Sequence, residues 1–325
     1  MISVAVGHML LTMTTQDNHR PLLDWLLAKF PDVPKKRAKQ WITAGRVNVN
    51  GIVVRKPHQL MSNPGVALKL LDRQATTLDC GRDGWQIHTR VNLMYLDSAL
   101  AIVNKGPGLL SLSAAPDDLS AQSILSDFLS GKLHIFDRTL VERTLPAVYR
   151  RLKPLPVHRL DQYTSGVFCM AMNSTSRASL IELVSAHKMQ REYVAYVEGR
   201  LKLAQGTWRN WLKLSEDELR QVVVLQPEAE AVEAITHYEV IAELEGVTKL
   251  RLKLETGRKH QIRAQAAFAG APLIGDRTYN PRRRIEFPRQ ALHAETLSFE
   301  HGEKMTWKAA MPGDLQQLEA SLRRR

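Results

Sequence analysis

A base, a cation and a carboxylate stand within four residues near the middle of the chain, at His158-Arg159-Leu160-Asp161. A short polar turn follows, and beyond Gly166 the apolar run Val167–Met172 is predicted to form a buried strand. A carboxylate at the mouth of a buried strand has a rigid support and little water around it, and both favour catalysis. Asp161 is therefore the first candidate for chemistry. On this motif alone, a structural aspartate in a turn or cap is an equally good interpretation.

Other kinds of site also use a histidine and an aspartate. A hydrolase with a nucleophile elbow needs a Gly-x-Ser-x-Gly turn, and the sequence has none. A metal site needs a second cluster of ligands, and a nucleotide hydrolase needs a Walker-type phosphate loop. A glycosidase needs a second carboxylate. The sequence supports none of these three. One carboxylate, an aromatic residue and several arginines remain, and this set suits chemistry on a nucleobase withdrawn from its stack.

The composition favours a partner with many negative charges. The chain has 325 residues, a formal net charge of +12 and 44% hydrophobic residues, enough for an ordinary core. The two cysteines, Cys80 and Cys169, belong to no paired motif, which argues against a disulfide scaffold or a cysteine-based zinc site. No apolar run is long enough to span a bilayer. Nucleic acid is thus the first candidate partner, and the cytoplasm is the expected compartment.

Much of the excess positive charge lies between Arg20 and Asp72, where ten Lys and Arg residues stand against three Asp residues. Leucines and Trp25 at helical spacing predict one short helix, and Lys35–Ala44 predicts a second. Asn50-Gly51 between apolar residues is a strong signal for a tight hairpin. We therefore expect a small module of two helices and a hairpin, in which one helix is strongly basic.

The run from Lys36 to Gly51 resembles the small RNA-binding domain named after ribosomal protein S-four. The resemblance implies that the basic helix and the hairpin bind RNA by its backbone and shape. Clustered cations agree with this, since they neutralise phosphates and release counterions. The alternative interpretation is a basic helix that is merely solvated. The residues predicted to bind RNA here are Lys36, Arg37, Lys39 and Arg46.

The rest of the chain shows a mixture of helix and strand patterns. Helices are predicted near Ser120–Leu129, Ser174–His187 and Leu315–Leu322, strands near Met189–Gly199, Thr236–Ala242, Lys249–Leu254 and Arg289–Leu297, and a hairpin at Trp208–Gln226. The strand that ends at Leu254 leads through a glycine turn into an alanine-rich helix. Arg258 and His260 at that turn make a plausible seat for an anion, and Arg263 is expected to face the same region.

Five motifs in the same order resemble those of pseudouridine synthases of the RluA type, and the likeness runs from Val91 to the C-terminus. They are Tyr95–Gly108, His158–Gly166, Arg191–Gly199, Leu254–Arg263 and Pro272–Tyr279. The departures are Gly106, where the family usually has Pro after the lysine, and Gln162, where Arg is frequent. The resemblance implies an enzyme that isomerises uridine in RNA to pseudouridine. An isomerisation needs no redox step or energy input, so neither a cofactor nor a metal is expected.

The resemblance also implies roles for four residues. Asp161 matches the catalytic carboxylate, which attacks the sugar, attacks the base or abstracts a sugar proton. Arg159 matches the residue that helps to displace the target base. Tyr193 matches the aromatic that stacks on uracil, and Arg263 the arginine paired with the catalytic aspartate. Arg258 and His260 are further predicted RNA-binding residues.

The predicted fold class is α+β, a pseudouridine synthase catalytic fold on a largely antiparallel mixed sheet, preceded by a small α/β S-four-like domain. The predicted boundaries are a flexible extension over 1–19, the S-four-like domain over 20–75, a linker over 76–90 and the catalytic domain over 91–325. The expected partner is ribosomal RNA, with transfer RNA as the second possibility, and the chain is expected to act as a monomer. The competing hypothesis is a non-catalytic RNA-binding or ribosome-assembly factor that retains the fold.

Overall fold

The computed structural model describes residues 19–43, 46–49, 52–54, 56–62, 68–70, 80, 84–113, 115, 117–132, 149–301 and 303–324. The chain divides into two compact units, residues 1–75 and 76–325, and each is described by itself. Several predicted segments fall wholly or partly outside the described residues, among them the extension 1–19, the turn Asn50-Gly51 and much of the first half of the linker 76–90.

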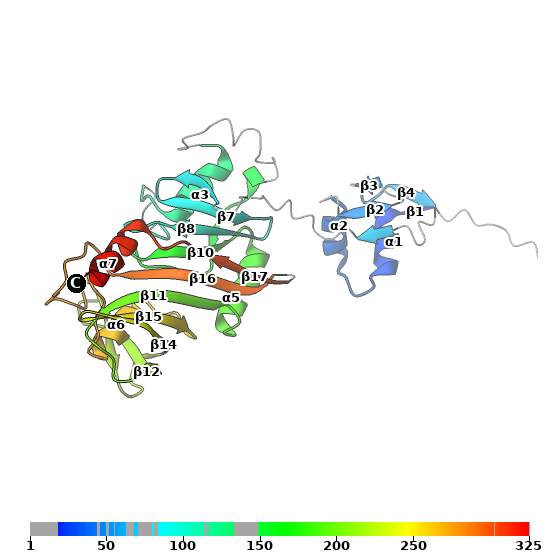
Figure 1. The fold of residues 1–325 in the computed structure, drawn as a ribbon. Coiled ribbons are helices and arrows are strands. Elements are labelled where there is room, and N and C mark those ends of the chain that lie inside the picture. Colours follow the sequence, from blue (N-terminus) through cyan, green and yellow to red (C-terminus); the bar gives the residue numbers. More distant parts are fainter. Residues whose placement is uncertain are drawn as a thin grey trace, which may run out of the picture. The chain divides into compact units, whose positions relative to one another are not determined.

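The first unit contains the two predicted helices and short strands (Figure 1). Its elements are β1 (His19–Pro21), α1 (Leu22–Lys29), α2 (Lys35–Thr43), β2 (Val47–Val49), β3 (Ile52–Val54), β4 (Leu60–Ser62) and β5 (Leu68–Leu70). Strand β1 pairs with β4, and β2 lies between β3 and β5. The antiparallel pairing of β2 with β3 confirms the predicted hairpin strands. Leu22, Leu26 and Ile42 are fully buried between the helices and strands, so the apolar face of each helix supplies the core.

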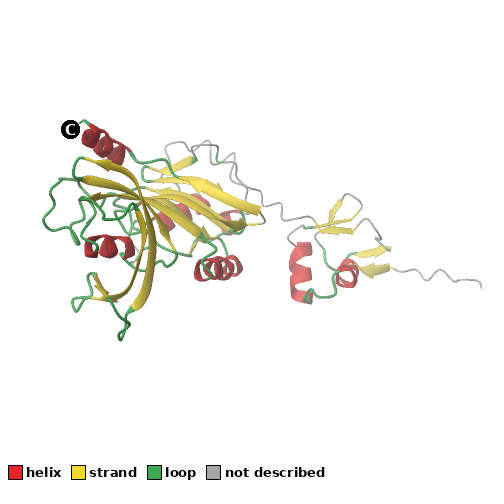
Figure 2. Cartoon of the chain, turned by 60° about the horizontal axis from the view of Figure 1, so that its bottom comes forward, coloured by secondary structure: helices red, strands yellow, loops and turns green. Residues whose placement is uncertain are grey.

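The second unit is built on one large sheet (Figures 1 and 2). Its elements are β6 (Trp85–His88), β7 (Val91–Leu96), β8 (Leu100–Lys105), α3 (Ala121–Ser130), a 3-10 turn at Tyr149–Arg151, β9 (Leu155–Pro156), β10 (Ser165–Ala171), α5 (Ser174–Ser185), β11 (Gln190–Glu198), β12 (Gln205–Leu214), β13 (Gln221–Val224), β14 (Val232–Leu244), β15 (Val247–Leu254), α6 (Gln261–Phe268), β16 (Leu292–His301), β17 (Glu303–Lys308) and α7 (Gly313–Arg323). The strand β6 lies inside the range predicted as a linker, where it forms one end of the sheet.

The strand order in this sheet is β13-β12-β14-β15-β11-β16-β10-β8-β7-β6, with β17 paired to β16 and β9 paired to β10. The neighbouring strands run antiparallel except β10 and β16, which run parallel. The predicted α+β class with a largely antiparallel mixed sheet is therefore confirmed. The parallel pair lies near the centre of the sheet and joins segments more than a hundred residues apart in sequence.

Strand β10 is buried along its whole length, as its apolar run predicts. Phe168 and Met170 belong to the core cluster that also contains α3, whereas Val167 and Cys169 belong to the cluster that contains Leu180 of α5. Because successive side chains of a strand point to opposite faces, an apolar run without polar alternation needs a core on both sides. Figure 2 shows the helices lying against the curved sheet. The segment before β10 is thus anchored in the most buried part of the unit.

Gly166, at the start of β10, is required by its backbone. Its φ is +120°, and a Cβ atom there would overlap the carbonyl oxygen of Ala294 on β16. We expect Gly166→Ala to lower the free energy of unfolding by about 2–4 kcal/mol, because it adds a steric clash to backbone strain. Urea denaturation measures this.

The matched control for Gly166→Ala is Gly246→Ala. Gly246 has a φ of +70°, but its Cβ position is open, so this variant carries only the backbone strain. Equal losses of stability in the two variants would contradict the predicted clash with β16.

Candidate active site

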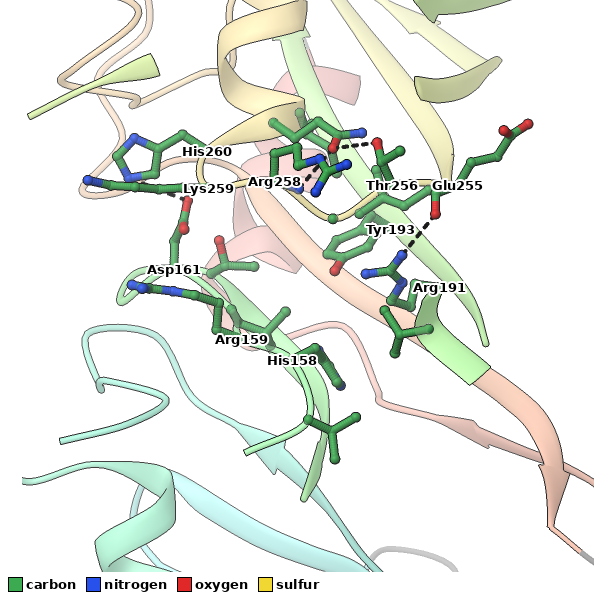
Figure 3. Close-up of a pocket in the computed structure, with 18 of the residues that line it drawn as sticks. His158, Arg159, Asp161, Arg191, Tyr193, Glu255, Thr256, Arg258, Lys259 and His260 are labelled. Atoms are coloured by element: carbon green, nitrogen blue, oxygen red, sulfur yellow. Dashed lines mark hydrogen bonds and ion pairs between the residues drawn. The ribbon is translucent and has the colours of Figure 1, made fainter. Parts of the chain in front are cut away.

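A cavity of about 630 Å³ opens at the entrance to β10, beside β11 and the loop that precedes α6 (Figure 3). This volume suits a small organic group such as a nucleoside. Six residues predicted from the sequence line it, namely Arg159, Asp161, Tyr193, Arg258, His260 and Arg263. The structure therefore brings together segments from three separate parts of the sequence. It also adds Arg191, Thr164 and Gly257 to the lining.

The turn that carries Asp161 is fixed mainly through its backbone. Ser111 Oγ donates to the Leu160 carbonyl at 2.8 Å and accepts from the Leu160 N–H at 3.0 Å. Thr164 N–H donates to the Asp161 carbonyl at 3.0 Å, and Arg289 donates to the Tyr163 carbonyl at 3.1 Å. A carboxylate on so well-braced a turn is held in one position, which is a requirement for a catalytic group.

Lys105 braces the same turn from inside the protein. Lys105 belongs to the motif Tyr95–Gly108, and it is fully buried. Its Nζ donates to the carbonyl oxygens of Leu109, Gln162 and Gly106 at 2.8, 3.0 and 3.1 Å. Burial lowers the pKa of Lys105 to about 7, against the opposing effect of Asp161. The three carbonyl acceptors need three N–H groups, which only the ammonium form has. Like the charge of Asp161, they therefore favour the protonated form of Lys105.

Replacement of Lys105 by Met should destabilise the protein by about 2–4 kcal/mol, because buried carbonyl groups would lose a charged donor. The turn with Asp161 should also shift, so turnover should fall. Urea denaturation and activity measure the two effects. Lys253→Met is the control, since Lys253 is exposed and makes only a surface ion pair with Glu192 at 3.2 Å. Stability equal to that of the control would contradict the bracing role.

Arg263 lies between two carboxylates. Its Nη1 donates to Asp161 Oδ2 at 3.1 Å, while Nε and Nη2 make a bidentate pair with Asp276 at 2.7 and 2.9 Å. The guanidinium carbon also lies 5.1 Å from the ring centroid of Tyr279. Burial opposes the charge on Arg263, but the hydrogen bonds and charges of Asp276 and Asp161 outweigh it and raise the pKa above its usual value. Asp276 fixes the guanidinium, and the guanidinium orients Asp161.

Asp276 was missed by the sequence analysis. It is fully buried, and Oδ1 also accepts from the backbone N–H groups of Thr278 and Tyr279 at 3.0 and 3.1 Å. The only indication in the sequence was the position of Asp276 in the polar segment Ile274–Asn280, which overlaps the family-like motif Pro272–Tyr279. An aspartate after Gly275 has the pattern of an ordinary turn residue, so the sequence did not reveal its contact with Arg263.

Tyr193 lies on β11 and is 6% exposed. Figure 3 shows its hydroxyl directed into the cavity, toward the side where Asp161 and Arg159 lie. Burial raises the pKa of Tyr193, Arg191 opposes that shift, and Asp161 adds to it. The phenol is therefore neutral near pH 7, and its ring offers a fixed flat wall to a planar ligand.

His260 and His158 have different surroundings. The Nε2 atom of His260 lies 4.0 Å from Asp161 Oδ2, too far for a hydrogen bond. Burial lowers the pKa of His260, and the charges of Arg263 and Lys259 add to the shift while Asp161 opposes it. The Nε2 atom of His158 accepts from the backbone N–H of Cys169 at 3.1 Å, and burial lowers its pKa to about 3. His158 is thus neutral and tied to β10, which is a structural arrangement.

Arg159 and Arg258 lie at the rim of the cavity and are exposed. Arg258 Nε donates to the Glu233 carbonyl at 3.0 Å, which ties the loop before α6 to β14. The helix begins at Gln261, so Arg263 lies within its first turn. The side chain of Arg159 lies below Asp161 in Figure 3.

Two of the four predicted RNA-binding residues of the first unit, Arg37 and Arg46, lie against one aromatic side chain. The guanidinium carbons of Arg37 and Arg46 lie 5.7 and 5.4 Å from the ring of Trp41. Lys36 and Lys39 are exposed on the same helix, α2. Contact with the Trp41 ring restricts the conformations of both arginine side chains. They therefore lose less conformational entropy when they bind a polyanion.

Within the described residues, no group of three or more His, Cys, Asp or Glu side chains has the arrangement of a metal site. The same part of the chain has no helix of the length and apolarity needed to cross a membrane.

Comparison with family models gives two matches. Residues 99–268 match the model described as RNA pseudouridylate synthase, and residues 20–62 match the S4 domain. The first match contains the Asp161 turn, Tyr193 and Arg263.

Curated relatives and solved structures agree with these matches. The ribosomal large subunit pseudouridine synthase D of Yersinia pestis is 31% identical over 324 residues, with coverage of 93% of this chain and 90% of that protein. An uncharacterised RNA pseudouridine synthase of Bacillus subtilis is 27% identical, with coverage of 97% and 98%. The human RNA pseudouridylate synthase domain containing 4 protein superposes with a TM-score of 0.56 at 20% identity, over 71% of this chain and 92% of that one. This last likeness shows the fold alone.

Proposed function

The chain belongs to the RNA pseudouridylate synthase family, and from that premise we propose that Asp161 carries the isomerisation of uridine in ribosomal RNA. The enzyme is an isomerase that acts on RNA and carries an S4 domain. The reaction breaks the bond between C1′ and N1 of uridine and joins C1′ to C5. The hydrogen of C5 is lost as a proton and N1 gains one, so atoms and charge balance without a second substrate.

The observation that carries the proposal is the arrangement of Arg263 between Asp161 and Asp276 beside Tyr193. The contact at 3.1 Å between Arg263 Nη1 and Asp161 Oδ2 holds the Asp161 side chain in place at the cavity. Tyr193 supplies a buried aromatic face, and stacking on such a face stabilises an extruded base by roughly 1–3 kcal/mol. Arg159 at the rim fills the place of the displaced base, while Arg258 and His260 contact the RNA nearby.

The choice of ribosomal RNA is supported by the names of the relatives. The proteins of Yersinia pestis and two Vibrio species are ribosomal large subunit pseudouridine synthases, and this chain is similar to them over nearly its whole length. We propose that the chain acts as a monomer in the cytoplasm. Transfer RNA is the second candidate substrate.

The test is tritium release from RNA labelled at C5 of uracil. Ribosomal RNA and transfer RNA from a strain that lacks the gene are offered separately to the full-length protein. Release from ribosomal RNA supports the proposal. Release from transfer RNA alone would move the substrate to that class, and release from neither would leave a non-catalytic RNA-binding factor.

The proposed role of α2 predicts a change in salt dependence. Replacement of Lys36, Arg37 and Lys39 by Gln should weaken RNA binding and reduce the slope of log Kd against log salt by about 2, since each phosphate contact contributes roughly 0.7–0.9. Filter binding over a range of salt concentrations measures the slope.

A control variant loses three cations that already pair with glutamates. Lys213, Arg251 and Lys308 lie 2.7, 2.8 and 3.4 Å from their partners, so their replacement by Gln should leave the slope nearly unchanged. An equal reduction in both triple variants would mean that net charge, and not the basic helix, sets RNA affinity.

A further inference from the structure

Arg191 is a buried cation in the wall of the cavity. It is 6% exposed and precedes Tyr193 by two residues on β11. Figure 3 shows its guanidinium beside the Tyr193 ring. The Nη2 atom donates to the carbonyl oxygen of Glu255 at 3.3 Å, where the Nδ1–H of His187 also donates at 2.7 Å. Its position is thus fixed by one shared backbone acceptor.

The guanidinium has unused donors. Its Nε is buried and makes no hydrogen bond, and within the described part of the chain no carboxylate forms an ion pair with it. The other two arginines that are buried among the described residues differ. Arg263 makes a bidentate pair with Asp276, and Arg289 makes one with Asp314 at 2.7 and 3.0 Å. A buried charge without a partner is costly, so Arg191 is expected to have a use for its charge.

Space for this guanidinium is provided by Gly257. A Cβ atom at Gly257 would overlap Nη1 of Arg191, so any other residue there would displace the side chain. Burial lowers the pKa of Arg191, and Tyr193 opposes that shift. An arginine nevertheless keeps its proton at any ordinary pH. The result is a permanent cation with free N–H groups, held at the edge of a flat aromatic wall.

We infer that Arg191 is a further catalytic residue, whose guanidinium binds the uracil ring while that ring carries negative charge. The inference rests on the proposed function, because it takes Tyr193 as the surface on which the base stacks. Arg191 and Tyr193 line the same cavity from the same strand, so a ring on the Tyr193 face has its edge near the guanidinium.

The reaction places negative charge on uracil whichever role Asp161 has. When the bond from C1′ to N1 breaks, its electron pair stays on the base and spreads over N1, O2 and O4. When a carboxylate adds to the base, the ring also becomes an enolate. The electron pair then forms the bond from C5 to C1′. The C5 proton leaves and N1 gains a proton, so the product ring is neutral. A fixed cation that pairs only with the charged ring lowers the barrier without tightening substrate or product binding.

The test uses Arg191→Gln and single-turnover reactions at saturating enzyme. The rate on uridine RNA should fall by about 10²-fold, the usual cost of one charge-stabilising donor, while Kd for RNA stays within about twofold. An RNA with 5-fluorouridine at the target position provides the second substrate, and its consumption is followed. Fluorine withdraws electrons and stabilises the uracil anion itself. The fold-decrease in rate caused by Arg191→Gln should therefore be at least about fivefold smaller with this substrate than with uridine RNA.

Arg191→Lys keeps the charge and should retain an intermediate rate, which keeps the test informative if Arg191→Gln fails to fold. Arg251→Gln on the neighbouring strand β15 is the control, because Arg251 is only half-buried and pairs with Glu239 at 2.8 Å. If Arg191→Gln lowers the rate by the same factor on both substrates, the inference is overturned in favour of a structural role. A loss confined to Kd would overturn it in favour of a phosphate contact. Lack of tritium release by the unaltered enzyme would refute the proposed function itself, and the inference with it.

Discussion

Asp161→Asn is expected to lower turnover by about 10⁴-fold or more while leaving RNA affinity close to that of the unaltered protein. The substitution removes the charge that the proposed reaction uses, but it keeps the shape of the side chain. Arg263 remains fixed by Asp276 at 2.7 and 2.9 Å, so the cavity should keep its geometry. Tritium release under single-turnover conditions measures the rate, and filter binding measures the affinity.

The control for Asp161→Asn is Glu239→Gln, which removes one carboxylate from an exposed ion pair with Arg251. It should leave the rate unchanged. Activity of Asp161→Asn within tenfold of the unaltered enzyme would contradict the assignment of Asp161 as the catalytic carboxylate. Loss of RNA binding in the same variant would mean that the cavity had changed shape, and would point to a structural aspartate.

Arg263→Met should abolish activity and also destabilise the protein by about 3–5 kcal/mol, because Asp276 would be left as a buried carboxylate without its cation. Its remaining hydrogen bonds come from the backbone N–H groups of Thr278 and Tyr279. Urea denaturation gives the stability and tritium release gives the activity.

A second substitution separates the two effects of Arg263. In Arg263→Met/Asp276→Asn the unpaired charge is removed, so a large part of the lost stability should return. Activity should not return, because Asp161 still lacks its partner. Recovery of activity in the double variant would show that Arg263 acts only through stability.

The sequence was most informative where a pattern has a local physical cause. The apolar run after Gly166 predicts a strand buried on both faces, and β10 is one. Asn50-Gly51 predicts antiparallel strands on either side, and β2 and β3 pair in that way. A helix was predicted near Ser120–Leu129, and α3 spans Ala121–Ser130 with Ser120 as its N-cap.

Contacts between distant segments were not readable in this way. Lys105 follows a strand, as many surface lysines do, and only the folded turn shows that its ammonium group points inward to three carbonyls. Asp276 and Arg191 have no local pattern that sets them apart, since an ion pair or its absence depends on three-dimensional neighbours. The pairing of Asp161 with Arg263 came from resemblance to a family, and their spacing of 102 residues could not have supplied it.

The parallel pair of β10 and β16 has a consequence for the order of events during synthesis. Asp161, Tyr193 and Arg263 all precede β16, yet β16 is the strand that separates β10 from β11 in the sheet. A nascent chain whose residues 292–301 have not yet left the ribosome therefore carries every predicted catalytic residue. It still lacks the strand that places β10, and with it Asp161, at its distance from Tyr193 on β11. Loops of this length close late, because contacts between distant segments must overcome the loop entropy first. Enzymatic competence is thus expected only after β16 has been made, because β16 completes the sheet between β10 and β11.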